Sequence, residues 1–418
     1  MQKIMMTSLQ STNSPPQKFS YWIMLSLSLI VMIGLGCGEE KTAWDNHTEN
    51  GDRLLQQGQF SAAEKEYQAA LKEAQLKEHD PRLVKSLNKL AILHDAQGEY
   101  AKATDFLQQS IEIYTQGGTS QQLELAASLS NLGAVYYAQQ QYDNAKPLFE
   151  QAIQIRENEL GKEHKDLVND LKNLAGLHAR QQAYDQAEPH LQRALMIIEK
   201  SSGPESTNLV PHLNNLALLY QAQQRLDESE ALLKQSIVIN EKSMGADNPR
   251  ITGSLNNLAL LYNEKKNYPQ AEVLLKRILD IYEKALGPDS PQVAASLSQL
   301  AALYHEQGQQ KKAQELLERA RASLEKKLGK EDPRLARVLN NLALVYATQN
   351  NMKQAEELFQ HTIAIIEKTK GKDHPLIERT LRNYASFLTK QKRTKEAEPL
   401  EIRANAIREQ YQQEKNQS

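Results

Sequence analysis

The sequence contains a single cysteine, Cys37, in 418 residues. A chain with one cysteine forms no internal disulfide, so its fold must be held together by packing. Aromatic residues make up only 6%, and a formal net charge of −2 gives no whole-chain argument for nucleic-acid binding. Only one long uncharged apolar run occurs, at residues 19–36, which excludes a polytopic membrane protein. The chain is not of the disordered class either, because leucine-rich segments recur throughout it.

The apolar run at residues 19–36 predicts export. It reads FSYWIMLSLSLIVMIGLG, and Lys3 and Lys18 precede it. Positive residues stay on the cytoplasmic side of a membrane, so the bulk of the chain is expected on the other side. Cys37 follows directly after the small residue Gly36, which resembles a bacterial lipoprotein signal. The resemblance implies lipid attachment at Cys37. An ordinary signal peptide or a retained signal anchor stays open as the alternative.

The rest of the chain is a 42-residue repeat in eight registered copies. Each copy has a first leucine, a second large apolar residue three positions later, a small residue directly after it, and usually a ring three positions beyond that. These spacings of three and four predict a helix, and a polar turn then leads to a second helix that ends at a glycine. The first leucines are Leu87, Leu129, Leu171, Leu213, Leu255, Leu297, Leu339 and Leu381.

These positions resemble the tetratricopeptide repeat. Segments such as LNNLALLY (213–220 and 255–262) and LGPDSP (286–291) are similar to the kinesin light chain subtype of that repeat. The resemblance implies an all-α fold, a right-handed superhelical solenoid of stacked antiparallel helix pairs. A weaker copy precedes the eight, so about nine units are expected. Because no single pair can bury its apolar face, the pairs must stack.

The expected domain organisation follows from these boundaries. Residues 1–36 are a signal or membrane-targeting segment, and 37–46 are a short linker after the anchor cysteine. Residues 47–410 form one repeat solenoid, and 411–418 are a polar tail.

Asparagine recurs two residues after the first leucine of the repeat. It is a poor residue for a helix interior, and its amide can both donate to and accept from a peptide backbone. In the tetratricopeptide family this register lines the concave groove, so the resemblance implies that these side chains hold an extended peptide. The alternative is that they bond to a neighbouring helix within the stack. The residues are Asn131, Asn173, Asn215, Asn257, Asn341 and Asn383.

Arginine joins this register only in the last two copies. Arg337 and Arg379 lie four residues before Asn341 and Asn383, so each pair shares a helix face, and Arg382 adjoins the second pair. The arrangement resembles the carboxylate clamp of the family, which implies a partner with an acidic segment or a free carboxyl terminus. A solvated charged face is the alternative.

The sequence offers no support for catalysis. The histidines do not cluster, and no HExxH, glycine-rich phosphate loop or GxSxG motif occurs outside the N-terminal segment. We therefore expect no enzyme, no cofactor, no metal, no small-molecule substrate and no nucleic acid.

The expected function is that of a peptide- or protein-binding scaffold. We expect it to be exported and membrane-anchored in a bacterial cell envelope, facing the periplasm or the exterior. The alternative is a structural subunit of an envelope complex that uses its convex face.

Overall fold

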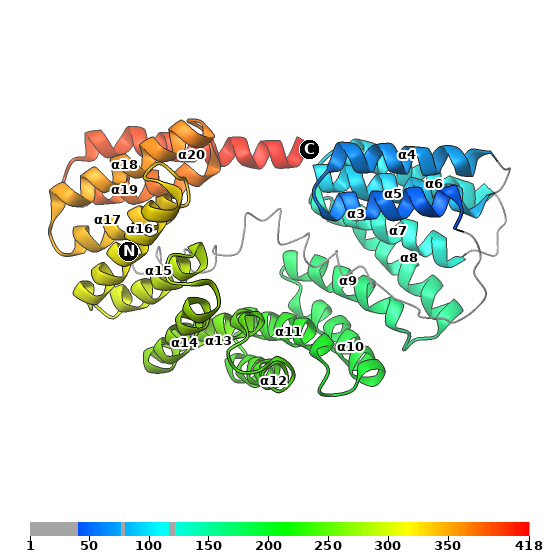
Figure 1. Cartoon of the computed structure of the whole chain (residues 1–418), viewed down its shortest axis with the longest axis horizontal. Coiled ribbons are helices and arrows are strands. Elements are labelled where there is room, and N and C mark those ends of the chain that lie inside the picture. The colour runs from blue at the N-terminus through cyan, green and yellow to red at the C-terminus, as the bar shows by residue number, and fades with distance from the viewer. Residues whose placement is uncertain (1–40, 77–79, 117–121, 418) are drawn as a thin grey trace. The chain divides into compact units, whose positions relative to one another are not determined.

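The computed structural model describes residues 41–76, 80–116 and 122–417, and every regular element in these ranges is a helix (Figure 1). The helices form nine antiparallel pairs across the described ranges, which confirms the all-α class and the number of repeats. They divide into two compact units: an N-terminal unit up to Pro204 and a C-terminal unit from Glu205 to Glu414. In these ranges no helix is both long and apolar enough to span a bilayer. Cys37 lies outside the described residues.

In each pair the first helix is called the A helix and the second the B helix. The N-terminal unit contains α3 (Ala43–Gln56) with α4 (Phe60–Gln75), α5 (Pro81–Gln97) with α6 (Tyr100–Gln116), α7 (Gln122–Ala138) with α8 (Tyr142–Leu160), and α9 (Val168–Arg180) with α10 (Tyr184–Ser202). The C-terminal unit contains α11 (Val210–Ala222) with α12 (Leu226–Met244), α13 (Thr252–Glu264) with α14 (Tyr268–Leu286), α15 (Pro291–Glu306) with α16 (Gln310–Leu328), α17 (Leu335–Thr348) with α18 (Met352–Lys370), and α19 (Glu378–Lys390) with α20 (Thr394–Gln417). Short 3-10 turns precede four A helices: η1 (Lys165–Leu167), η2 (Thr207–Leu209), η3 (Pro249–Ile251) and η4 (Pro375–Ile377).

Six of the nine described B helices, α8, α10, α12, α14, α16 and α18, end at glycine because the backbone there takes a conformation that other residues avoid. Gly245, for example, has φ 87° and ψ 154°, and its N–H donates to the carbonyl of Glu241. This region of backbone space is essentially restricted to glycine. A polar side chain then caps the next helical segment, as when Asn248 Oδ1 accepts from the backbone N–H of Arg250 at 2.9 Å. The predicted glycine stops are therefore confirmed.

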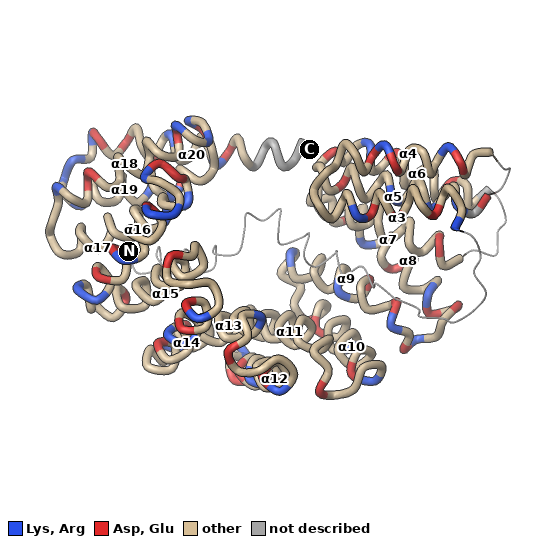
Figure 2. The backbone as a smooth tube through the Cα atoms, in the orientation of Figure 1, with Lys and Arg blue, Asp and Glu red and all other residues tan. Residues whose placement is uncertain are grey.

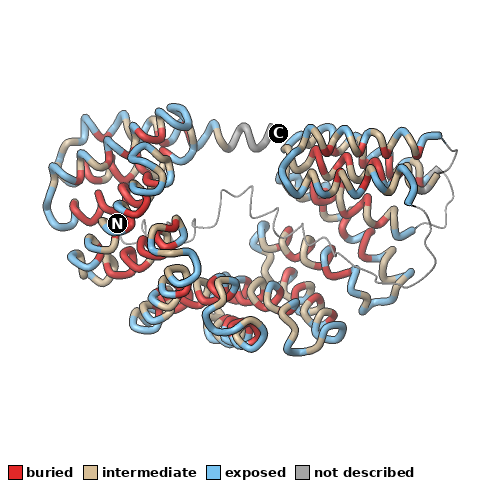
Figure 3. The backbone as a smooth tube through the Cα atoms, viewed as in Figure 1, coloured by how far each residue is buried: buried red, intermediate tan, exposed pale blue. Residues whose placement is uncertain are grey.

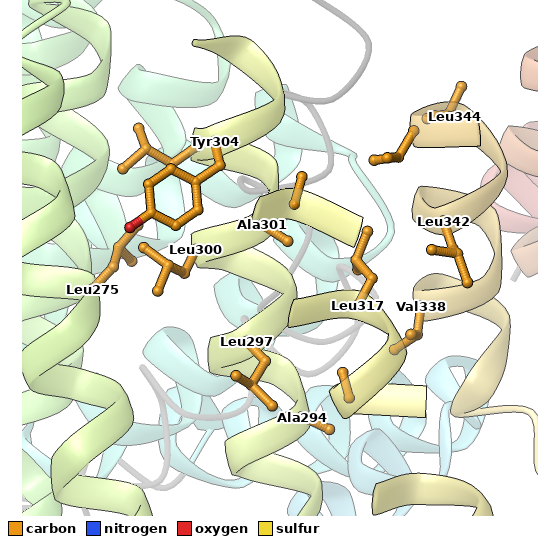
Figure 4. Packing of buried hydrophobic residues seen from close by; sticks show 14 of the residues in the cluster. Leu275, Ala294, Leu297, Leu300, Ala301, Tyr304, Leu317, Val338, Leu342 and Leu344 are labelled. Carbon is orange, nitrogen blue, oxygen red and sulfur yellow. The ribbon is translucent and has the colours of Figure 1, made fainter. Parts of the chain in front are cut away.

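The core lies between the helices of each pair and between consecutive pairs (Figure 3). At the predicted small position, Ala301 of α15 is fully buried and lets the partner helix α16 approach closely. Large residues fill the remaining space: Figure 4 shows Leu300 and Tyr304 on the side of Leu275 from α14, and Leu317 on the side of Val338 from α17. Within the C-terminal unit the α15–α16 pair is thus covered by its neighbours on both sides, as stacking requires.

Polar side chains also join consecutive A helices. Asn88 of α5 donates to Ser128 of α7 at 2.9 Å, and Asn214 of α11 donates to Ser254 of α13 at 3.1 Å. In both cases the donor follows the first leucine of its repeat and the acceptor precedes the first leucine of the next. Burial makes such bonds valuable, because an unpaired polar group there costs about 1–3 kcal/mol.

A sharp test of this packing is at Gly133, the glycine at the small position of the α7–α8 pair. A Cβ placed there would lie 2.8 Å from Cε1 of Phe149, whose side chain is fully buried. We predict that Gly133→Ala lowers the free energy of unfolding by about 1–3 kcal/mol through overpacking. Urea unfolding of the purified chain measures the change.

The companion change Phe149→Leu provides the control, because Ala175 and Leu191 already form an alanine–leucine pair in the next repeat. Gly133→Ala should cost clearly less in the Phe149→Leu background. An equal cost in both backgrounds would show that the ring does not set the limit.

Candidate functional site

Four of the six predicted asparagines are half-buried and lack a hydrogen-bond partner. These are Asn131 and Asn173, on α7 and α9 of the N-terminal unit, and Asn215 and Asn257, on α11 and α13 of the C-terminal unit. None of their amides bonds to another side chain or to the backbone within the described parts of the chain. Each unit therefore carries two amides at the same register of consecutive A helices, partly open to solvent.

The remaining two asparagines belong to the stack instead. Asn341 and Asn383 are each only 2% exposed. Asn383 Nδ2 donates to Asn340 Oδ1 at 3.0 Å, which links α19 to α17. Asn341 instead accepts from Asn340 on its own helix, at 3.5 Å. Neither buried amide is open to a peptide, so we correct the prediction for these two residues. Gln299 of α15 behaves like Asn383, since it donates to Asn256 of α13 at 2.9 Å.

The residue before the first leucine makes different hydrogen bonds in different A helices. Ser254 accepts the bond from Asn214, which leaves Asn257 on the same helix without a role in the stack. In α15 the equivalent Ser296 bonds back to the carbonyl of Gln292, and Gln299 makes the link between A helices. In α19 the equivalent residue is Thr380, and Asn383 makes the link. Because Ser254 and Ser296 are the same residue type, this position alone does not predict which amide makes the link.

At the start of the chain the register holds Lys89 rather than asparagine. Its Nζ lies 2.6 Å from Asp52 Oδ2 of α3, so this lysine closes an ion pair within the first two helix pairs. Tyr67 of α4 donates to the same carboxylate at 2.7 Å.

Arg382 also bonds to residues of its own unit. Its guanidinium pairs with Glu378 on the same helix and donates to Asn405 Oδ1 of α20 at 3.0 Å. It therefore braces the last helix pair, and we remove it from the predicted peptide site.

Arg337 is the arginine best placed for an external anion. It is half-buried at the start of α17 and makes no hydrogen bond or ion pair with any described residue. Burial, and then the positive charge of Arg379, lower the pKa of Arg337 to about 10. Burial also lowers the pKa of Arg379, with Glu378 opposing it. Both side chains stay protonated at neutral pH, so two partly desolvated positive charges lie within reach of each other.

Most other charged residues are paired and interspersed along both units (Figure 2). One recurring network joins the repeat's ring to a carboxylate of the preceding B helix. Tyr262 donates to Glu230 at 3.0 Å, and Lys265 lies 2.6 Å from the same carboxylate. Burial raises the pKa of Glu230, but the bonds from Lys234, Lys265 and Tyr262 outweigh it and lower this pKa to about 2. Networks of this kind hold repeats together and leave few charges available to a partner.

In the residues described by the structure, no group of three or more histidine, cysteine or acidic side chains could hold a metal ion. The isolated histidines have local structural roles instead. His164 and His374 each accept from a backbone N–H two residues on, at 3.3 and 3.2 Å, and so cap the short turns that precede α9 and α19.

The sequence matches the family model described as the tetratricopeptide repeat at residues 47–116, 124–200, 170–242, 250–326 and 334–410. The chain belongs to the tetratricopeptide repeat family. This repeat supplies the family's scaffold of helix pairs, which generally carries no catalytic centre. Comparison with curated proteins gives no match.

Solved structures share this fold. The apo form of the quorum sensor NprR from B. thuringiensis is 14% identical, with a TM-score of 0.53, and the match covers 87% of this chain and 97% of that one. Aspartyl phosphate phosphatase F from Bacillus subtilis is also 14% identical, with a TM-score of 0.51 and coverage of 90% and 96%. A putative kinesin light chain from Podosopora anserina is 28% identical over 50% of this chain and 99% of its own, with a TM-score of 0.44.

Proposed function

We propose that the protein is a scaffold that binds an extended peptide segment of a partner along the exposed register of its A helices. The proposal rests on four asparagine amides, two in each unit, that make no hydrogen bond to any described residue. An amide that bonds to backbone N–H and C=O groups reads an extended chain without regard to its side chains. This suits a scaffold that holds a segment of variable sequence.

The recurrence of asparagine supports this proposal against a purely structural role. Asparagine lowers helix stability relative to leucine, glutamine or lysine. At these four positions no hydrogen bond to a described residue offsets that loss. The same register shows what a structural role looks like, because Asn383 and Gln299 are bonded across the stack. Asn215 and Asn257 make no such bond and stay half-buried.

The finer proposal is that an acidic segment or a free carboxyl terminus of the partner binds at Arg337 and Arg379. Arg337 has no acidic partner of its own in the described structure, and Arg379 adds a second positive charge beside it. An anion that bonds to both guanidinium groups would relieve this repulsion and replace the hydration that burial has removed. Because Asn341 and Asn383 are buried, the arginines alone would hold the anion.

We also propose that the protein is exported and anchored to the membrane of a bacterial cell envelope through lipid on Cys37, with residues 47–410 as one repeat domain. The proposal rests on the charge pattern of residues 1–36 and on the cysteine that follows them. The family match at 170–242, which runs across the boundary between the two compact units, supports one continuous array of repeats.

The asparagine register is tested with peptides selected from a random linear library against the full chain in detergent. We predict that Asn215→Ala combined with Asn257→Ala weakens a selected peptide by roughly tenfold, since each amide contributes about 0.5–1.5 kcal/mol through its hydrogen bonds. Isothermal calorimetry measures the affinity. The control is Gln235→Ala with Gln270→Ala, two exposed amides on the B helices α12 and α14. If the control pair weakens binding and the asparagine pair does not, the partner binds the B helices and the proposal fails.

The arginine subsite is tested with two versions of one selected peptide, one with an acidic free carboxyl terminus and one amidated and neutral. Replacing Arg337 and Arg379 by glutamine should weaken the acidic version several-fold at low salt, and less at high salt because salt screens the attraction. The neutral version should bind both proteins equally. Arg334→Gln is the matched control, because Arg334 already pairs with Asp332 at 2.8 Å. Equal affinity of wild type and double variant for the acidic peptide at low salt would exclude the subsite.

Lipid attachment is tested by metabolic labelling with palmitate in a bacterial host that processes lipoproteins. Wild-type protein should incorporate label and sediment with membranes, and Cys37→Ala should lose the label. Absence of label from the wild type, or unchanged label in the variant, would rule out the lipid anchor. Membrane association without label would then indicate a retained signal anchor.

A further inference from the structure

Two histidine rings stack against each other in the last helix pair of the N-terminal unit. The rings of His178 on α9 and His190 on α10 have centroids 5.8 Å apart and planes inclined by only 5°. His178 is 4% exposed, and its Nδ1 is buried without a hydrogen-bond partner among the residues that the structure describes. His178 therefore has little access to water, and His190 covers it while being half-buried itself.

This pair replaces a different arrangement in the other repeats. At the position of His178 five of the repeats have a tyrosine. In three of them its hydroxyl donates to a carboxylate 32 or 28 residues earlier: Tyr262 to Glu230, Tyr304 to Glu272 and Tyr346 to Glu318. At the position of His190 six of the repeats have a leucine: Leu148, Leu232, Leu274, Leu316, Leu358 and Leu400. The α9–α10 pair thus has two titratable rings where most of these repeats have a tyrosine and an aliphatic side chain.

The charges that face the two rings favour their neutral forms. From α8, Lys146 occupies the place 32 residues before His178, where the carboxylate stands in the tyrosine networks, and Glu150 lies one turn further along. From α10, Arg193 faces His190. Burial lowers the pKa of His178, Lys146 lowers it further, and Glu150 opposes them. Burial likewise lowers the pKa of His190, and His178, Arg193 and Lys146 all add to the effect.

We propose that the stacked His178–His190 pair is an acid-sensitive lock, which holds α9 against α10 while both rings are neutral and releases them when the rings gain protons. Protonation would place two positive charges on rings whose centroids are 5.8 Å apart. Beside them lie Lys146 and Arg193, which already pair with Glu150 and Glu157. The buried Nδ1 of His178 has no acceptor to which a new N–H could donate. Both effects penalise the protonated folded state.

The direction of the pH effect follows from proton binding. The unfolded chain binds protons on histidine with a pKa of about 6.5, and in the folded pair both pKa values lie below their ordinary value. Below pH 6.5 the opened state therefore holds more protons than the closed state, and the stability of the pair falls as pH falls. The loss is complete once the pH lies below the pKa values of the folded pair.

The lock would also act on the peptide site, a consequence that rests on the proposed function. Asn173 lies on α9, five residues before His178. When α9 separates from α10, this asparagine loses its fixed place in the register. A bound partner would then be held less tightly in an acidic environment.

The test is amide hydrogen exchange of the full chain at pH 7.5 and pH 5.5, expressed as protection factors so that the intrinsic pH effect on exchange is removed. The variant combines His178→Tyr with His190→Leu, the residues common at these positions in the other repeats. In the wild type the protection of α9 and α10 should fall by up to about tenfold for each of the two histidines, because pH 5.5 lies about one unit below the pKa of an unfolded histidine. The variant should show no such local fall. Exposed His361 of α18 provides the control, since His361→Gln should leave the wild-type response unchanged.

An identical pH response of α9–α10 in wild type and double variant would overturn the lock. Should the double variant fold poorly, His190→Leu alone removes the charge pair and is expected to reduce the response. Direct titration of isotope-labelled histidine by NMR gives an independent reading, because a ring of this pair that titrates at or above 6.5 also contradicts the proposal. Exchange requires no partner, so the lock can stand even if Asn173→Ala proves to have no effect on peptide binding.

Discussion

The close approach of helices A and B at one small residue per repeat is the constraint on which the rest of the structure depends. Ala91, Gly133, Ala175, Ala217, Ala259, Ala301, Ala343 and Ala385 occupy this position, and all are buried. A larger side chain there would push the two helices apart, and the leucines and rings on either side would lose their contacts with the next pair. The contact also fixes the rotation of each A helix, which decides which residues face the stack and which face solvent.

Once this rotation is fixed, many polar side chains form hydrogen bonds or ion pairs within the stack. The ends of the B helices are tied to the preceding loop by ion pairs of constant spacing, as in Lys326–Asp289 and Lys368–Glu331 at 2.6 Å each. These pairs are exposed, so each contributes less than about 1 kcal/mol, and they help to set register rather than stability. The hydrogen-bonded tyrosine–glutamate pairs, such as Tyr262 with Glu230, connect an A helix to the preceding B helix. Among the predicted site residues, those that make no hydrogen bond or ion pair with a described residue are Asn131, Asn173, Asn215, Asn257 and Arg337.

The repeat pattern was sufficient to predict the helix pairs, the polar turns and the glycine stops, because each depends on residues within one repeat. The asparagine register was predicted only in part. Whether Asn257 is free and Asn383 is bonded depends on a residue of the neighbouring contact, such as Ser254 or Thr380, and this information lies between repeats rather than within one. Arg382 could not be distinguished from Arg337 for the same reason, since its partner Asn405 belongs to another helix.

The claim that each helix pair is stabilised mainly by its immediate neighbours is tested most directly by hydrogen exchange on Ala259→Leu. Ala259 is 3% exposed at the close contact of α13 with α14. The variant should lose protection first in α13–α14 and next in α11–α12 and α15–α16, while α3–α8 and α19–α20 keep their wild-type protection. A uniform loss of protection across all nine pairs would contradict the account.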